Sequence, residues 1–483
     1  MNKLSIKRNL ILNTAYQILT MITPFITAPY VSRVLGVDGV GIYSYTGSIQ
    51  YYFTMLAALG TASYGTREIA RNRNNKAQRS KLFWEIELLT VFTTLASLCI
   101  WCLILVASTN YRIYLLACTF NIIAVLFDIS WFYAGLEHFE HTVLQNSIFK
   151  ILGIIAIFAF VKDQSDVVVY ILIMALTTCL GNLSMWLYLP KYVNKTEISK
   201  LDIKPHFKET IIYFIPTIAT SIYTVLDKTL IGIITKSDSQ NGYYEQATKI
   251  INMTKTICFV ALNNVLGSRI SFLFSEKKYE EVKQRIDQSI DYISFMGVGI
   301  LFGLLGISAD FVPWFFGKGY ENVVFLLYIL SPLSLIIGLS NCLGSQYYTP
   351  AGLRIQSAKY LIAGSVVNLI LNLLLIPHFM SYGAAVATVI AESIISILYL
   401  ANCNRYLTVQ QIISHIWRKF IAGILMLFWI NILKSFIEIP FIRMICGIFT
   451  GSIIYILILI LLKDSFIKFA KILIINVLKK HSG

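Results

Sequence analysis

Charged side chains within long apolar stretches are the residues of this sequence best suited to chemistry. The basic members are Lys150, Lys228, Lys249, Lys255 and Arg269, and the acidic members are Asp128, Asp227, Glu245 and Glu392. A charge in an apolar environment is costly unless it is paired or faces a wet cavity, so each is a candidate for binding an ion. Lys150 and Lys255 have no acidic neighbour at helical spacing, which favours a wet path for an anion. Glu245 lies four residues before Lys249, which favours an ion pair, and Arg269 favours a structural role.

Uncharged polar residues recur at helical spacing in two of the apolar stretches. The first stripe consists of Asn13, Gln17, Thr20 and Thr27 with Pro24, and the second of Thr217, Ser221, Thr224 and Lys228 with Pro216. One such stripe fits polar contacts between packed helices as well as it fits a cavity lining. Two stripes at matching positions favour a shared lumen, and the two prolines would supply bends in the helices.

Sites for covalent or metal chemistry are not predicted. Residues 137–141 read Glu-His-Phe-Glu-His, but their spacing matches no zinc-protease pattern, and a wet interfacial loop is the favoured interpretation. Cys99 and Cys102 have redox spacing within an apolar run, which favours packing. Phosphate-binding glycine loops and nucleophile motifs are also missing from the sequence. We therefore expect no catalytic residue, no metal and no cofactor.

The composition explains why buried charges are informative in this chain. Of 483 residues 57% are hydrophobic and 13% are charged, and the mean hydropathy is +0.69. Soluble domains average about 45–50% apolar and about 25% charged residues, so too little charge is present to cover a water-soluble surface. Disordered and disulfide-scaffold classes are excluded by the apolar content and by only eight cysteines. The chain is predicted to be a polytopic membrane protein.

Fourteen stretches are long enough to cross the hydrocarbon, which needs roughly 20 apolar residues each. They cover about residues 9–31, 41–60, 83–107, 113–134, 143–161, 167–189, 210–234, 244–272, 289–309, 323–343, 359–377, 383–403, 419–437 and 442–462. With both termini inside, the inner segments hold 28 of the 40 basic residues and the outer segments hold 7. Since cytoplasmic loops collect Lys and Arg, this bias supports the count and the orientation. The net charge of +15 therefore indicates membrane topology rather than nucleic-acid binding.

An internal echo predicts how these spans are grouped. Gly41 is followed by Tyr43, and Gly242 by Tyr244, in segments that follow the first and the seventh span. The echo begins six helices apart, so the two halves would share one orientation in the membrane. We expect an all-α fold of two pseudo-symmetric six-helix lobes with a cleft between them, plus two C-terminal helices. The predicted parts are 1–209, 210–403, 404–462, and a basic amphipathic tail at 463–483 on the inner leaflet.

Four segments together resemble a known family. They are Pro29–Gly36 with Gly39, Gly41 and Tyr43; Asp128–Glu137; Asp227-Lys228 through Gly242-Tyr243-Tyr244; and Asn368–Asn372 with Ile376-Pro377 and Gly383–Thr388. In order, length and span number the chain resembles the Wzx-type bacterial polysaccharide flippases, which transport O-antigen or capsule repeat units. They belong to the superfamily that includes MATE drug exporters and MurJ.

The resemblance implies two six-helix lobes around a cationic central cavity. It also implies transfer of an undecaprenyl-pyrophosphate-linked oligosaccharide from the inner to the outer leaflet of the bacterial cytoplasmic membrane by alternating access. Cations that could match the diphosphate are Arg33, Lys150, Lys228, Lys249 and Lys255. Asn13, Gln17, Thr20, Ser221 and Thr224 are the expected polar lining. Coupling to H⁺ or Na⁺ through Asp128, Asp227 or Glu392 is expected, without nucleotide hydrolysis.

Two other functions remain open on the sequence. A cation or drug antiporter of the same fold would have a cavity of net negative sign, and the buried charges number five positive to four negative. A membrane enzyme that polymerises or ligates lipid-linked glycans would need a long outer loop with catalytic residues, and no such loop is found in the sequence. Expected partners are the lipid-linked glycan, the bilayer and other membrane proteins of polysaccharide assembly, with no nucleic acid.

Overall fold

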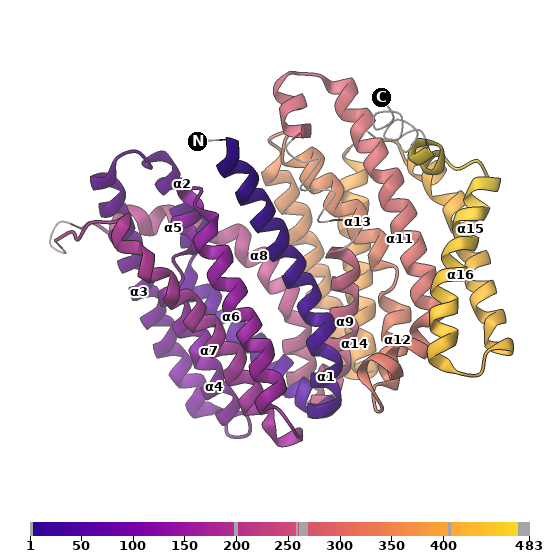
Figure 1. The fold of residues 1–483 in the computed structure, drawn as a ribbon, viewed down its shortest axis with the longest axis horizontal. Coiled ribbons are helices and arrows are strands. Elements are labelled where there is room, and N and C mark those ends of the chain that lie inside the picture. Colours follow the sequence, from indigo (N-terminus) through magenta and orange to yellow (C-terminus); the bar gives the residue numbers. More distant parts are fainter. Residues whose placement is uncertain (1–2, 198–200, 257–258, 260–268, 404–406, 472–483) are drawn as a thin grey trace. The chain divides into compact units, whose positions relative to one another are not determined.

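A computed structural model describes residues 3–197, 201–256, 259, 269–403 and 407–471 of the chain (Figure 1). Within these ranges the side chains of residues 3–13, 215–217, 219–224 and 409 fall outside the description. Every regular element in the described ranges is helical. The chain forms two compact units, residues 1–242 and 243–483, and each is described by itself.

The first unit is built from eight α-helices and three short 3₁₀ segments among the described residues. In chain order they are α1 (Lys3–Ala58), α2 (Thr61–Arg71), α3 (Lys76–Ala107), α4 (Arg112–Ile123), η1 (Ala124–Phe127), α5 (Ser130–Gly135), α6 (Phe139–Phe160), η2 (Gln164–Asp166), α7 (Val167–Met185), η3 (Trp186–Lys191) and α8 (Lys204–Thr235).

The second unit follows from α9, which begins just before the boundary. Its described elements are α9 (Asp238–Lys255), α11 (Tyr279–Phe316), α12 (Glu321–Leu330), α13 (Leu333–Leu343), the π-helical turn η6 (Gly344–Tyr348), α14 (Arg354–Ala401), α15 (Val409–Phe436) and α16 (Pro440–Leu461).

Two of the longest helices each contain two predicted spans. The backbone of α1 leaves helical geometry at Gly36, between the spans predicted at 9–31 and 41–60. Likewise α14 breaks at Met380, where φ is 52°, between the spans at 359–377 and 383–403. In the described part of the chain nine helical segments are long and apolar enough to cross a membrane, and the bent pair α12–α13 makes a tenth. The structure is thus consistent with about fourteen spans, and the predicted span 244–272 lies partly outside the described residues.

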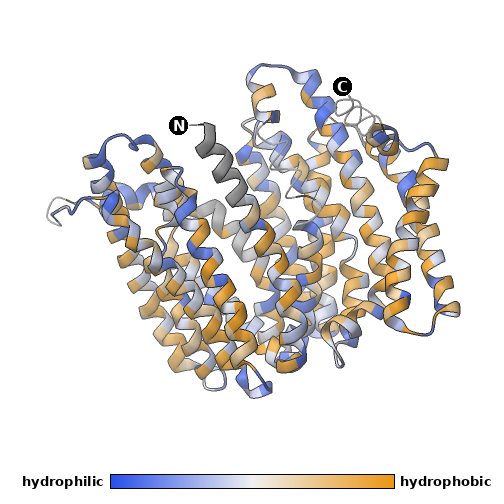
Figure 2. Ribbon diagram, in the orientation of Figure 1, coloured by the Kyte–Doolittle hydropathy of each residue, from blue (hydrophilic) through white to orange (hydrophobic). Residues whose placement is uncertain are grey.

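Large apolar side chains cover the outer surfaces of the helices. Exposed examples include Leu103, Phe160, Phe449 and Leu461, the last with 78% of its surface accessible. Figure 2 shows apolar residues along the middle of the helices and hydrophilic residues gathered towards their ends and connections. Apolar surface on this scale is stable only in contact with lipid. The chain is therefore a multi-pass membrane protein.

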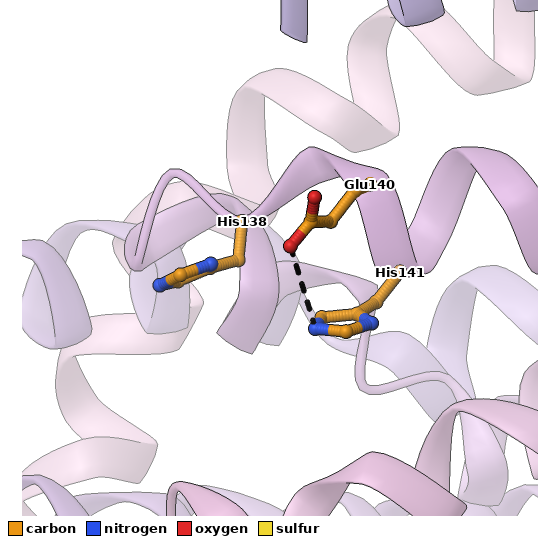
Figure 3. Close-up of side chains that lie close together, drawn as sticks. All are labelled: His138, Glu140 and His141. Carbon is orange, nitrogen blue, oxygen red and sulfur yellow. Dashed lines mark ion pairs between the residues drawn. The ribbon is translucent and has the colours of Figure 1, made fainter. Parts of the chain in front are cut away.

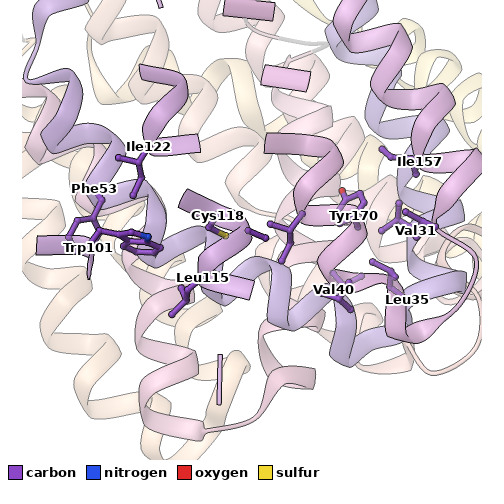
Figure 4. Packing of buried hydrophobic residues seen from close by; sticks show 14 of the residues in the cluster. Val31, Leu35, Val40, Phe53, Trp101, Leu115, Cys118, Ile122, Ile157 and Tyr170 are labelled. Carbon is purple, nitrogen blue, oxygen red and sulfur yellow. The ribbon is translucent and has the colours of Figure 1, made fainter. Parts of the chain in front are cut away.

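The interior of the first unit is an apolar cluster that joins α1, α3, α4, α6 and α7 (Figure 4). Trp101 is fully buried, and its ring meets Phe53 edge-to-face with centroids 4.9 Å apart. The Trp101 indole donates to the hydroxyl of Thr119 over 2.9 Å, so its one polar atom is satisfied. Tyr170 and Ile157 extend the cluster across α7 and α6. This packing holds in place the helices that line the cavity described below.

The two glycines of the sequence echo lie at points where backbones nearly touch. A Cβ atom on Gly41 would lie 1.8 Å from the carbonyl oxygen of Asp238, and one on Gly242 would lie 2.2 Å from that of Val37. The contacts are reciprocal, since each glycine packs against the segment that precedes the other. Both positions need glycine because any side chain would push two main chains apart.

Replacing Gly41 with alanine is expected to destabilise the fold by about 1–3 kcal/mol, because overpacking against a backbone cannot be relieved by a side-chain rotation. Gly47 is the matched control: it lies on the same helix with nothing within 4 Å of its Cβ position. Gly47→Ala should be neutral or slightly stabilising, since alanine favours a helix over glycine. Thermal unfolding of the detergent-purified variants measures the difference, and equal melting temperatures would refute the packing argument.

Candidate functional site

A polar cavity of about 350 Å³ opens within the first unit. Its walls come from α1, α6 and α7 and from the residues that follow η1. The lining contains one ammonium group, one carboxylate and several amides and hydroxyls, although it lies among membrane-spanning helices. Polar cavities at such positions are typical of the pathways of transporters.

One face of α6 supplies the basic side of the cavity. Asn146, Lys150, Gly153 and Ile157 line it at spacings of four, three and four residues, so all project from the same side of the helix. The Lys150 amine lies 5.6 Å from the ring centroid of Tyr16, in cation–π contact. Within the described part of the chain no carboxylate approaches this amine within ion-pair distance. Lys150 therefore presents its ammonium group to the cavity without a direct ion pair among the described residues, and Asp128 supplies the one carboxylate of the same lining.

The carboxylate in the lining comes from a break in the fourth span. The helix tightens to 3₁₀ at η1, and Asp128 then adopts an extended conformation with φ −79° and ψ 90°. Its Oδ1 accepts from the backbone N–H of Ser130 over 3.0 Å. Carbonyl groups freed by the break are bonded by side chains from the sixth predicted span, 167–189: the Asn182 amide donates to Ala124 and the Trp186 indole to Phe127. A discontinuous helix next to a polar cavity is a recurrent feature of transporter binding sites.

Hydroxyl groups from α1 and α7 line the remaining walls. Thr27 donates to the carbonyl of Thr23, Thr177 donates to Ile173 and Thr178 donates to Met174, each within its own helix. Because each hydroxyl hydrogen is used by a backbone carbonyl, the oxygen lone pairs remain to accept hydrogen bonds. The cavity can thus bind an anionic group at Lys150 and polar hydroxyl groups along its walls, with no group placed for covalent chemistry.

The other predicted cations are not in this cavity. Lys249 forms an ion pair with Glu245 over 3.8 Å, and Lys255 donates to the Asn252 amide oxygen over 3.1 Å. Arg33 is exposed and Lys228 is half-buried. The structure therefore places only Lys150, of the five cations, in the cavity of the first unit.

The predicted polar lining and the predicted ion-coupling residues are only partly in the cavity. Thr27 lines it, whereas Gln17 is exposed and Thr20 donates to the carbonyl of Gln17. Asp128 lines it, whereas Asp227 and Glu392 are buried elsewhere. The side chains of Asn13, Ser221 and Thr224 lie outside the described residues.

Several lining residues were missed in the sequence, although a periodic signal was available. Tyr170, Thr177, Thr178 and Asn182 lie at spacings of seven, one and four along α7, which is one broad helical face. Asn146 lies four residues before Lys150 and could have been found from that cation. Hydroxyls and amides are common in membrane helices, so their spacing alone does not identify a cavity lining.

Lys419 has a different role from the one predicted from the sequence. It is the first residue of the predicted span 419–437 and was counted among the 28 basic residues of the inner segments, but its side chain is fully buried. Its amine bonds Asp291 over 2.6 Å and Asp464 over 3.0 Å, and His415 Nδ1 lies 3.1 Å from the same Asp291. Lys419 is thus a structural cation within the second unit rather than a solvated one.

Comparison with known sequences identifies relatives along most of the chain. The "Putative O-antigen transporter" of Escherichia coli K12 is 24% identical over 404 residues, which cover 83% of this chain and 97% of that protein. The "Probable low-salt glycan biosynthesis flippase Agl15" of Haloferax volcanii is 24% identical over 262 residues, which cover 52% of this chain and 54% of that protein.

Solved structures show the same fold. The lipid II flippase MurJ in an inward closed conformation superposes with a TM-score of 0.74 at 17% identity, covering 93% of this chain and 97% of that one. An inward-facing MATE-family multidrug transporter gives 0.61 at 12% identity, with coverage of 82% and 98%. The predicted MATE- and MurJ-like all-α fold is confirmed.

A family model described as "Polysaccharide biosynthesis protein" matches residues 6–271. This match includes every residue of the cavity lining, the broken fourth span and Lys150. Since it covers more than half of the 483 residues, the chain belongs to the polysaccharide biosynthesis protein family.

Proposed function

We propose that this protein is a flippase, which carries lipid-linked oligosaccharide repeat units from the inner to the outer leaflet of the membrane. The observation that carries the proposal is the ammonium of Lys150, which has no direct ion pair among the described residues, in a polar cavity among apolar helices. Membership of a polysaccharide biosynthesis family supports it, as do relatives whose names describe an O-antigen transporter and a glycan flippase. The MurJ-like fold is consistent with a transporter rather than an enzyme.

The cargo we propose is an undecaprenyl-pyrophosphate-linked oligosaccharide. A diphosphate cannot enter hydrocarbon unless its charge is matched, and the Lys150 amine can supply a charge-assisted hydrogen bond. The threonine oxygens and the amides of Asn146 and Asn182 offer partners for sugar hydroxyls. The polyprenyl tail needs no polar site, because it can stay in the bilayer while the head group crosses. Alternating access would then expose the cavity to each side in turn.

We further propose that the protein acts in a bacterial cytoplasmic membrane with both termini inside, for surface polysaccharide or capsule export. The bias of basic residues towards alternate loops supports this orientation. H⁺ or Na⁺ would drive the cycle, with Asp128, Asp227 and Glu392 as candidate carriers; of these, Asp128 lines the cavity. Other membrane proteins of polysaccharide assembly are the expected partners.

A deletion strain of the native host tests the function. We expect surface polysaccharide to disappear and lipid-linked repeat units to accumulate on the inner leaflet, because synthesis of the units continues without export. Plasmid-borne wild-type protein should restore both. A cation or drug antiporter would instead leave the polysaccharide intact and change drug susceptibility, and that outcome would reject the flippase in favour of the antiporter.

A further inference from the structure

The start of α6 gathers three metal-ligating side chains that the proposed transport function does not use. His138, Glu140 and His141 each offer one donor atom, and these atoms all lie within 4.8 Å of one another. Figure 3 shows the three side chains at the start of the helix, with Glu140 facing His141. The His141 Nε2 atom lies 4.0 Å from Glu140 Oε1. All three side chains are half-buried, so they are reachable from water and still held by neighbours. We propose that His138, Glu140 and His141 form a zinc site, completed by a water molecule.

The donor set favours zinc over the commoner hard cations. Two imidazoles and one carboxylate, with one position left to water, make up a frequent protein zinc site. Mg²⁺ and Ca²⁺ prefer oxygen ligands alone, so they match only Glu140 in this cluster. Zinc–ligand bonds of about 2.1 Å in a tetrahedron put ligand atoms about 3.4 Å apart. Rotating the side chains so that their donor atoms move by about one to two ångströms would therefore bring the donors to bonding distance from one zinc ion.

The backbone that carries the ligands is already in place. Glu137 adopts a left-handed conformation with φ 63°, and the next N–H, from His138, donates to the Tyr133 carbonyl over 2.9 Å. Arg73 forms an ion pair with Glu137 over 3.3 Å, so the carboxylate of the metal-ligating cluster is that of Glu140. Because the turn is fixed by these bonds, zinc binding needs to order only three side chains.

Aromatic residues hold the two imidazole rings from outside. The ring of His141 stacks on Tyr188 with centroids 4.5 Å apart, and the ring of His138 lies 5.2 Å from Tyr192. The Tyr192 hydroxyl lies 3.1 Å from His141 Nε2. This contact is a hydrogen bond to the same nitrogen that would bind zinc, so zinc binding must displace it. The released hydroxyl would then be placed to hydrogen-bond the zinc-bound water.

Zinc at this site would stabilise the helix that carries the transport cavity. His138 is the N-cap residue of α6, and Glu140 and His141 lie in its first turn. Lys150 lies nine residues after His141 on the same helix. The site would also tie α6 to the tyrosines at η3 through the zinc-bound water. This inference stands apart from the proposed function, since metal binding can be measured without any glycan.

Purified full-length protein carrying a tag other than polyhistidine tests the site. After metal removal with a chelator, reloading with Zn²⁺ and removal of the excess, we expect the wild type to retain one Zn²⁺ per chain by elemental analysis. It should also melt at a higher temperature with Zn²⁺ than with Mg²⁺. His138→Ala and His141→Ala should each bind Zn²⁺ at least about tenfold more weakly. His378→Ala is the matched control, because this exposed histidine on α14 should contribute nothing.

Glu140→Gln keeps the shape of the side chain and removes its charge, so it tests the site even if a histidine variant misfolds. We expect it to weaken Zn²⁺ binding without changing the elution profile of the protein. The site is refuted if the wild type retains no zinc, or if Glu140→Gln and the folded histidine variants bind zinc as tightly as the wild type.

Discussion

Replacing Lys150 with alanine is expected to reduce polysaccharide export by about tenfold to a hundredfold. The amine faces the cavity with no carboxylate partner within the described chain, so its charge is available to the cargo. A hydrogen bond to a charged group contributes about 1.5–3 kcal/mol, which corresponds to that range of rates. Surface polysaccharide measured in the native host, at matched levels of membrane protein, gives the readout.

Matched variants separate the charge of Lys150 from its packing. Lys150→Arg keeps the charge and should retain most of the export, whereas Lys150→Met keeps the apolar stem and should not. Lys162 is a control at the end of the same helix, exposed and bonded to the Phe158 carbonyl, and Lys162→Ala should export normally. Lys228→Ala and Lys255→Ala test whether further cations serve the path. Normal export in Lys150→Ala, Lys228→Ala and Lys255→Ala would contradict the anion path.

Replacing Lys419 with methionine should destabilise the second unit by about 3–5 kcal/mol, the cost of removing one partner from a buried ion pair. Its amine is fully buried and bonds two carboxylates and the carbonyl of His415. Without it, Asp291 and Asp464 remain as buried charges with one cation fewer. Thermal unfolding in detergent and the yield of folded protein report the loss.

Lys434 provides the control for this prediction, because it lies on the same helix, is exposed, and bonds only the Asn431 amide in the described structure. Lys434→Met should change stability by less than about 0.5 kcal/mol. Adding Asp291→Asn to Lys419→Met should recover part of the loss, since one uncompensated charge is removed. A Lys419→Met protein as stable as the wild type would show that the buried network contributes nothing.

The two lysines show what local spacing in the sequence can indicate and what it cannot. Lys150 was selected because no acidic residue lies at helical spacing from it, and this local test agrees with its position in the cavity. The burial of Lys419 could not be predicted, because its partners Asp291 and Asp464 lie 128 and 45 positions away in the sequence. A sequence separation of that size cannot indicate contact without the packing of α11 and α15.

The cavity lining and the metal cluster were also recognised only from the tertiary structure. The spacing of residues 137–141 matches no zinc-protease pattern, so only the side-chain conformations and the surrounding tyrosines show that the donors lie close together. In the sequence, nothing distinguishes Thr177 and Asn182 from other polar residues of apolar helices. The structure shows that they line the same cavity as Lys150.

Membrane insertion, the all-α fold and the family could be read from the chain alone. Composition and span length are set by contact with lipid, and the period of an α-helix is a local property, so both are written along the sequence. The tertiary structure decided which buried charges face the cavity and which are paired, and why Gly41 and Gly242 recur. Those outcomes depend on the rotation and close approach of helices distant in the chain, because a side chain in hydrocarbon is stable only with the partners that packing brings to it.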